Sequence, residues 1–154
     1  MNATIQDRDL TKQAPHSPRE RIDGFAIAAR TVDKCRAKAA GTVGEYHYDC
    51  PLDNMLFNFK GITAAQFTTA VAAAKDYSDV GAWLHSTGTK KTIEEVKAWS
   101  DRVEASSPLR NPERHDAFVA NCNKLGINPE TSSTFDWLEA DDSASFKPAS
   151  KPTT

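Results

Sequence analysis

Signals for the start of a helix recur along this chain and limit its fold more than any other feature. Residues 63–66 (TAAQ) and 92–95 (TIEE) form capping boxes, in which the first and fourth side chains satisfy free N–H groups of a first helical turn. Residues 17–20 (SPRE) show the same pattern with proline at the first helical position. Apolar residues follow these signals at helical spacing. The sequence therefore predicts a mainly α protein.

We expect a compact single-domain bundle of about five helices, because 154 residues fit one domain with a substantial core. The predicted helices lie at about 18–40, 63–74, 77–85, 92–107 and 112–125, with a last short turn at 134–140. Residues 44–59 resist a helical interpretation. Polar and aromatic residues alternate from Glu45 to Asp49, which predicts one short extended loop or hairpin around residues 44–50.

On either side of the helical domain, at residues 15–140, we expect a flexible N-terminal segment at 1–14 and a disordered tail at 141–154, because both ends are polar. No apolar run is long enough to span a membrane, and the start lacks the apolar stretch of a signal peptide. Cys35, Cys50 and Cys122 have no paired or metal-type spacing and look like reduced thiols. These features predict a cytoplasmic location and no membrane partner.

The net charge is only −2, but the charge is distributed unevenly along the chain. Basic residues outnumber acidic ones between 18 and 40. Acids dominate from residue 128 onward, where they are Glu130, Asp136, Glu139, Asp141 and Asp142. We expect the basic segment to pack beside the acidic one. A nucleic-acid partner is disfavoured, because it would need a coherent basic surface with aromatic platforms.

Charged residues continue the line of the buried face on the first predicted helix. Phe25 and Ala29 belong to the apolar stripe, Asp33 and Arg36 follow at the same spacing, and Arg30 lies at its edge. A charge within a buried stripe costs several kcal/mol unless it is paired. One interpretation is structural, with Asp33 and Arg36 bonded to each other along the helix. The other is that Arg30, Asp33 and Arg36 face a ligand.

The segment after this helix could supply chemistry. If residues 45–49 are extended, Glu45, His47 and Asp49 point to one side, and an imidazole between two carboxylates suits general acid–base catalysis. These three are therefore the candidate catalytic residues. The candidate ligand-binding residues are Arg30, Asp33, Arg36, Tyr46 and Cys50. A metal ion is disfavoured, because three potential ligands without a supporting helical pair are a weak signal.

Several short segments, taken together, resemble a family of small bacterial proteins of unknown function. They are residues 10–13 (LTKQ), 17–21 (SPRER), 33–34 (DK), 40–42 (AGT), 44–46 (GEY), 50–53 (CPLD) and 59–62 (FKGI). The resemblance fades in the second half, where Asp79 and Trp83 still fit, and His16 stands where an arginine is expected. It implies a small single-domain bacterial protein with its hallmark residues in the first sixty positions. It implies no particular activity.

Two functions from different classes follow from these features. In the first, a small ligand, anionic because of the arginines, lies between the first helix and the 45–50 loop, where it is either bound or turned over by a small enzyme. In the second, the chain is a non-catalytic protein-interaction module or adaptor, which needs an exposed apolar patch near residues 55–59. The partners considered are therefore a small molecule, another protein or a second copy of the chain. The sequence specifies no cofactor. The clustering of polar groups at one segment favours the first function.

Overall fold

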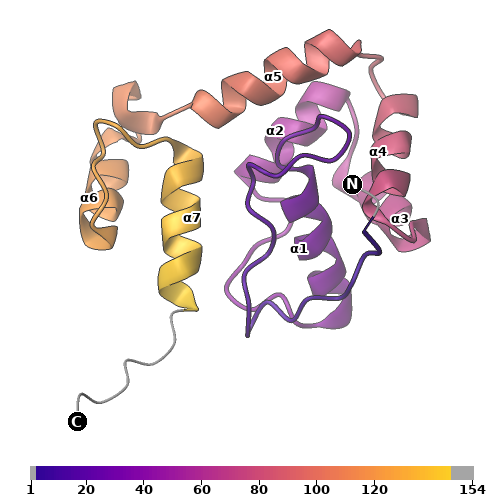
Figure 1. Ribbon diagram of the computed structural model, residues 1–154, viewed down its shortest axis with the longest axis horizontal. Helices are drawn as coiled ribbons and strands as arrows, with labels where there is room; N and C mark the ends of the chain where they lie inside the picture. Colours follow the sequence, from indigo (N-terminus) through magenta and orange to yellow (C-terminus); the bar gives the residue numbers. More distant parts are fainter. Residues whose placement is uncertain (1–2, 147–154) are drawn as a thin grey trace.

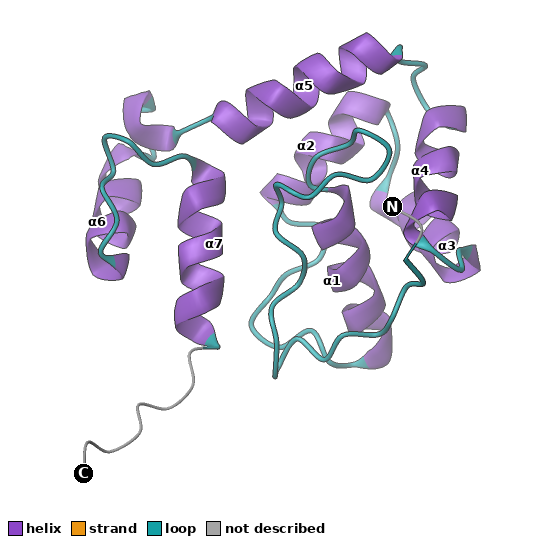
Figure 2. Cartoon of the chain, in the orientation of Figure 1, coloured by secondary structure: helices purple, strands orange, loops and turns teal. Residues whose placement is uncertain are grey.

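The computed structural model describes residues 3–146, which contain seven α-helices, one 3-10 helix and no strand. The helices are α1 (Ala28–Ala40), α2 (Pro51–Lys60), α3 (Ala64–Ala73), α4 (Tyr77–Ser86), α5 (Ile93–Ala105), η1 (Pro108–Arg110), α6 (His115–Leu125) and α7 (Thr134–Ser145). Figure 2 shows helices joined by loops throughout the described chain. The predicted α class is confirmed, with more helices than the five expected.

Helices α2, α3 and α4 lie around α1 on one side of the molecule, and α5, α6 and α7 form the other side (Figure 1). Figure 1 shows α1 among α2, α3 and α4, with α5 running across the top of the view towards α6 and α7. Side chains of α7 contact the N-terminal loop that precedes α1. No helix within residues 3–146 is long and apolar enough to cross a membrane.

The main apolar core lies around α1 and the loop that leads into it. Phe25, Ile27 and Val32 are fully buried there and pack with Phe57 from α2 and Phe67 from α3. The capping boxes predicted at Thr63 and Thr92 are present at the starts of α3 and α5. Burial of these large apolar side chains is the principal stabilising term of such a domain.

The first helix begins ten residues later than the SPRE signal predicts, at Ala28 rather than Pro18. Residues 17–27 form turns, and Asp23, Gly24 and Ile27 have positive φ angles of 47°, 90° and 74°, which a right-handed helix does not allow. The Ile27 N–H donates to the carbonyl oxygen of Pro18 at 2.8 Å, so the chain folds back on itself before the helix starts. The predicted end of this helix at Gly41 is confirmed, with φ of 76°.

The segment predicted to be extended forms turns, and it leads directly into α2, which the sequence did not indicate. Cys50 is the N-cap of α2 and Pro51 its first residue. The Asp53 carboxylate accepts hydrogen bonds from the backbone N–H groups of Asp49 at 3.0 Å and Cys50 at 3.3 Å. Asp49 has φ of 65°, which interrupts the period-two alternation on which the extended interpretation depended.

Both ends of the described chain contact the rest of the fold. Ile5 and Leu10 are buried, and their N–H groups donate to the carbonyl oxygens of Lys75 and Thr42 at 3.0 and 2.9 Å. At the other end α7 continues to Ser145, beyond the predicted start of the tail at residue 141. The remainder of that predicted tail, residues 147–154, lies outside the described residues.

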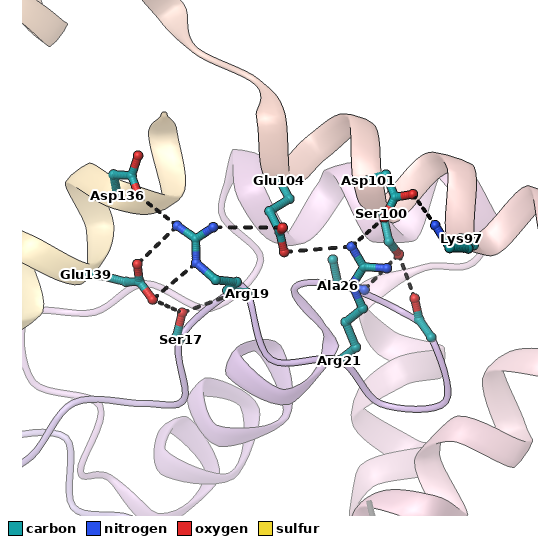
Figure 3. Close-up of polar contacts among 11 residues, drawn as sticks. Ser17, Arg19, Arg21, Ala26, Lys97, Ser100, Asp101, Glu104, Asp136 and Glu139 are labelled. Atoms are coloured by element: carbon teal, nitrogen blue, oxygen red, sulfur yellow. Dashed lines mark hydrogen bonds and ion pairs between the residues drawn. The ribbon is translucent and has the colours of Figure 1, made fainter. Parts of the chain in front are cut away.

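Ion pairs join the loop before α1 to α7, as the uneven charge predicts, and also to α5. The Arg19 guanidinium lies 2.8 Å from an Asp136 oxygen and 3.1 Å from a Glu139 oxygen, and Arg21 lies 2.8 Å from an Asp101 oxygen (Figure 3). These groups are partly exposed, so each pair contributes little by itself. Together they hold α5 and α7 against the N-terminal loop.

Ser100 makes a second, buried connection between α5 and the same loop. Its hydroxyl donates to the carbonyl oxygen of Gly24 at 2.7 Å and accepts from the N–H of Ala26 at 3.0 Å (Figure 3). Two backbone groups without helical partners thereby gain hydrogen bonds, and the bond to the Ala26 N–H is buried.

Two neighbouring residues of α2 test the position of the core. Phe57 is buried against Phe67 with ring centroids 5.3 Å apart, whereas Met55 is 38% exposed. We expect Phe57→Ala to lower the free energy of unfolding by about 3–5 kcal/mol, because it leaves a cavity in the core. Met55→Ala should change it by less than about 0.5 kcal/mol. Urea unfolding followed by circular dichroism measures both, and equal losses would contradict this core.

The contacts of Asp136 predict an acid-dependent loss of stability. The pKa of Asp136 is lowered by the Ser133 backbone N–H and by Arg19. Because the folded pKa lies below the unfolded value of about 3.9, the carboxylate stabilises the fold above that pH and loses its effect as the pH falls through the folded pKa.

We therefore expect the melting temperature of Asp136→Asn to lie below that of the parent at pH 6, with the difference shrinking towards zero at pH 2. Asp116→Asn, in the first turn of α6, is the matched control and should show little difference at either pH. A constant difference for Asp136→Asn across this range would contradict the assignment.

Candidate functional site

A cavity of about 480 Å³ opens between α1, the 44–50 loop and the end of α7. One part of its wall is apolar and the other carries charged or polar groups. The apolar part includes Leu10, Leu52, Leu138 and Phe146. The polar part includes Arg30, Lys34, Glu45, Tyr46, His47, Cys50, Asp141 and Ser145. The cavity lies between the first helix and the 45–50 loop, where the sequence-based hypothesis places a ligand.

Arg30 is buried in the inner wall and held in one orientation. Its two terminal nitrogens donate to the carboxylate oxygens of Asp142 at 2.7 and 3.2 Å, and one of them also donates to the His16 carbonyl at 3.3 Å. A bidentate pair of this kind fixes the plane of the guanidinium. Asp142 therefore attaches the last turns of α7 to α1.

Tyr46 completes this arrangement from the loop. Its hydroxyl donates to Asp142 at 2.8 Å, and its ring lies over the Arg30 guanidinium with 5.4 Å from the guanidinium carbon to the ring centroid. Burial and the Asp142 carboxylate raise the pKa of Tyr46 far above its ordinary value. Tyr46 is consequently a neutral phenol throughout the physiological range and acts as a hydrogen-bond donor.

Lys34 is the second buried cation of the wall, and Asp53 is its counter-ion. The Lys34 ammonium lies 2.9 Å from an Asp53 oxygen and 3.2 Å from the Cys50 sulfur. The Thr31 hydroxyl donates to the other Asp53 oxygen at 2.7 Å. Asp53 thus has partners for both oxygens, as a buried charge requires.

The candidate catalytic residues are only partly brought together. Glu45 and His47 are exposed and line the cavity, and Tyr46 lies with them rather than on the opposite side. Asp49 does not line the cavity, and its carboxylate accepts from the Asn54 side-chain amide at 2.9 Å. The turns at 44–50 account for the difference, because they remove the alternation of an extended chain.

Among the candidate ligand-binding residues, Arg30, Tyr46 and Cys50 line the cavity, whereas Asp33 and Arg36 do not. The buried Asp33 carboxylate accepts from the His16 backbone N–H at 2.7 Å and from the Tyr77 hydroxyl at 2.6 Å. The Arg36 side chain donates to Asp7 at 2.7 Å. The predicted Asp33–Arg36 ion pair is therefore wrong, since each residue pairs with a different segment.

Sequence reasoning singled out neither Lys34 and Asp53 nor Asp142 as parts of a site. The only sequence signal for Asp142 is its place among the C-terminal acids. Its partner, Arg30, lies 112 residues away along the chain. Among residues 3–146 no group of three or more His, Cys, Asp or Glu side chains is placed to hold a metal ion.

The fold and the cavity define a small helical domain with a ligand-sized hollow beside its most buried helix. The chain matches the family described as a domain of unknown function, DUF5069, over residues 12–144, and it belongs to this family. The match extends well into the second half, beyond the first sixty positions where the resemblance was concentrated. A search of curated proteins returned no match.

Two adjacent acids near the end of α7 test whether Arg30 needs its partner. We expect Asp142→Ala to lower the free energy of unfolding by about 3 kcal/mol, because it leaves a buried guanidinium without a counter-ion. Asp141→Ala, one position earlier and exposed, should cost less than about 0.5 kcal/mol. Chemical denaturation of the two variants measures the difference. Equal effects would show that the Arg30–Asp142 pair does not hold α7 in place.

Proposed function

We propose that the protein binds a small anionic ligand in the cavity between α1, the 44–50 loop and the end of α7. The observation that carries this proposal is the presence of two buried cations, Arg30 and Lys34, in the wall of one ligand-sized hollow. Cavities that bind small molecules are largely apolar, fall between roughly 300 and 1,000 Å³, and contain a few convergent polar groups. A hollow of about 480 Å³ meets that description.

Both cations keep hydrogen-bond donors for a ligand although each already has a counter-ion. A guanidinium has five N–H donors, of which Arg30 uses three in contacts with Asp142 and His16. An ammonium has three, of which Lys34 uses two with Asp53 and Cys50. The ion pairs hold these cations in fixed positions. Little side-chain entropy is therefore lost when a carboxylate or phosphate group binds to them.

Acidic residues at the cavity do not outweigh the preference of the two buried cations for an anionic ligand. Glu45 and Asp141 line the same hollow but are exposed to solvent. Charges in contact with water are screened by salt, whereas buried cations are screened much less. We therefore assign the anionic end of the ligand to the inner wall and its apolar body to Leu52 and Leu138.

His47 and Glu45 give the site a route to catalysis. Both line the cavity, so a bound ligand would lie within reach of an imidazole and a carboxylate. Histidine changes charge near neutral pH and is suited to moving a proton to or from such a ligand. The proposal therefore covers a binding protein and a small enzyme, with Asp49 outside the reacting group.

The alternative function, a protein-interaction module, has less support. It requires an exposed apolar patch near residues 55–59, but Leu56 and Phe57 are buried in the core. Phe59 is half-buried and stacks on Trp99, with ring centroids 4.6 Å apart. Met55 at this segment does not by itself make a surface of the size that marks an interface.

Stabilisation by small anions tests the proposal. Short-chain carboxylates, dicarboxylates and inorganic phosphate are added in a thermal-shift assay at constant ionic strength. A compound present at a hundred times its dissociation constant should stabilise the fold by about 2.7 kcal/mol, which is a rise of several degrees for a chain of this size.

Two variants separate the cavity from the rest of the surface. His47→Trp, which fills the mouth of the cavity, should abolish the shift, whereas Arg36→Ala, on a different face of α1, should preserve it. If no anion stabilises the parent, or if His47→Trp retains the full shift, the proposed site is wrong.

A further inference from the structure

Cys50 differs from the other two cysteines in its surroundings. It is half-buried and lines the cavity, whereas Cys35 and Cys122 are buried. Burial raises the pKa of Cys35 and of Cys122, which keeps both as inert thiols at neutral pH. Cys50 has instead a buried ammonium beside its sulfur, the Nζ of Lys34 at 3.2 Å.

Four side chains at this point form a chain of contacts that ends at the cavity. Cys50 contacts Lys34, Lys34 pairs with Asp53 at 2.9 Å, and the buried Thr31 hydroxyl holds Asp53 at 2.7 Å. A nucleophile within hydrogen-bond reach of a proton-transfer group, which is in turn oriented by a third residue, is the arrangement found in covalent catalysis. Asp53 and Lys34 are each buried, so the surrounding packing holds their side chains in place.

We propose that Cys50 is a nucleophile that accepts an acyl group from a small molecule bound in this cavity. Lys34 is the proton-transfer group and Asp53 is a positioning residue that acts through Lys34. The inference rests on the proposed function in one respect, because the same cavity brings the acyl donor to the sulfur. It adds the reaction and the class of substrate.

A buried cation and the N-terminus of a helix both adjoin the sulfur of Cys50. Cys50 is the N-cap of α2, a helix of 10 residues, so the positive end of the helix dipole faces it together with the Lys34 ammonium. The thiolate is the reactive form of cysteine. Asp53 is nearby and negative, but its charge is already shared among Lys34, Thr31 and two backbone N–H groups.

The reaction proceeds in two balanced steps. The Cys50 thiolate attacks the carbonyl carbon of an ester or thioester, the sulfur–carbon bond forms, and the bond to the leaving group breaks. The leaving group departs with the bonding electrons and takes a proton from the Lys34 ammonium. Water then attacks the thioester carbonyl carbon and gives one proton to the Lys34 amine. The carbon–sulfur bond breaks, which releases a carboxylic acid and the Cys50 thiolate. At neutral pH this acid loses its proton to water, and the resulting carboxylate is an anion of the kind that the inner wall is proposed to bind.

Acylation of the intact protein by p-nitrophenyl acetate tests the inference. This probe is neutral, so its reaction does not require the anion-binding property of the cavity. The release of p-nitrophenolate is followed at pH 7, and the acetylated cysteine is located by proteolysis and mass spectrometry. We expect Cys50 to be acetylated at least threefold faster than the same cysteine in a synthetic peptide of residues 46–54. Cys35 and Cys122 in the same digest should remain unmodified.

A paired substitution isolates the role of Lys34. Lys34→Met alone would leave Asp53 as an unpaired buried charge. The protein would then unfold whether or not Lys34 transfers a proton. Lys34→Met combined with Asp53→Asn removes both charges and keeps an acceptor for the backbone N–H groups. This double variant should melt close to the parent, while its Cys50 reacts at the rate of the peptide. Cys50→Ser should lose the labelled peptide and confirm its position.

The outcomes separate the two proposals. A parent Cys50 that reacts no faster than the peptide overturns the inference, whatever the thermal-shift assay shows. Fast reaction that is unchanged in a folded double variant overturns the assignment of Lys34. Fast acylation without stabilisation by any anion would leave Cys50 as the nucleophile and reject the anionic ligand.

Discussion

The structure depends on the charges that α1 carries into the interior. Arg30, Asp33 and Lys34 are consecutive or nearly so on a helix that is buried for most of its length. A charge in such surroundings is tolerated only when a partner of opposite sign or several hydrogen bonds accompany it. Each of the three charges therefore demands a partner from somewhere else in the chain, and the fold is arranged so that three different segments supply one.

Each partner comes from a different element and fixes that element in space. Asp142 attaches α7 through Arg30, and Asp53 attaches the start of α2 through Lys34. Tyr77 attaches α4 through Asp33, at 2.6 Å. Replacing a buried pair by apolar residues is often neutral for stability, so the pairs act chiefly by specifying how these segments are placed. The helices whose packing is apolar could slide or rotate more freely without them.

The cavity is a consequence of the same arrangement. Arg30 and Lys34 are one turn apart on α1, so their side chains emerge on the same face of the helix. Because their partners lie on α7 and at the start of α2, those two elements stand on either side of this face. The loop of residues 44–50 crosses between them, which places Tyr46 and Cys50 at the hollow. Structural pairing and candidate chemistry therefore involve the same side chains.

The sequence predicts whatever depends on neighbours along the chain and fails where distant residues decide. The capping boxes at Thr63 and Thr92 are local, and both helices start there. The equally good signal at Ser17 is overridden, because its hydroxyl donates to Glu139 across the molecule at 2.7 Å and the chain turns back at Ile27. Cysteine is an uncommon N-cap, which is why α2 was missed at Cys50.

In the candidate site, too, contacts between sequence neighbours were predictable and contacts between distant residues were not. Its location was predictable, because a charged helix and a polar loop adjoin each other in sequence and cannot separate far in space. Its internal organisation was not, since Asp142 is 112 residues from Arg30 and only the folded chain shows which acid is chosen. Asp33 and Arg36 illustrate the error that results. Their spacing permits a bond along the helix, but a pair three residues apart contributes only a few tenths of a kcal/mol, which the hydrogen bonds from His16 and Tyr77 to Asp33 exceed.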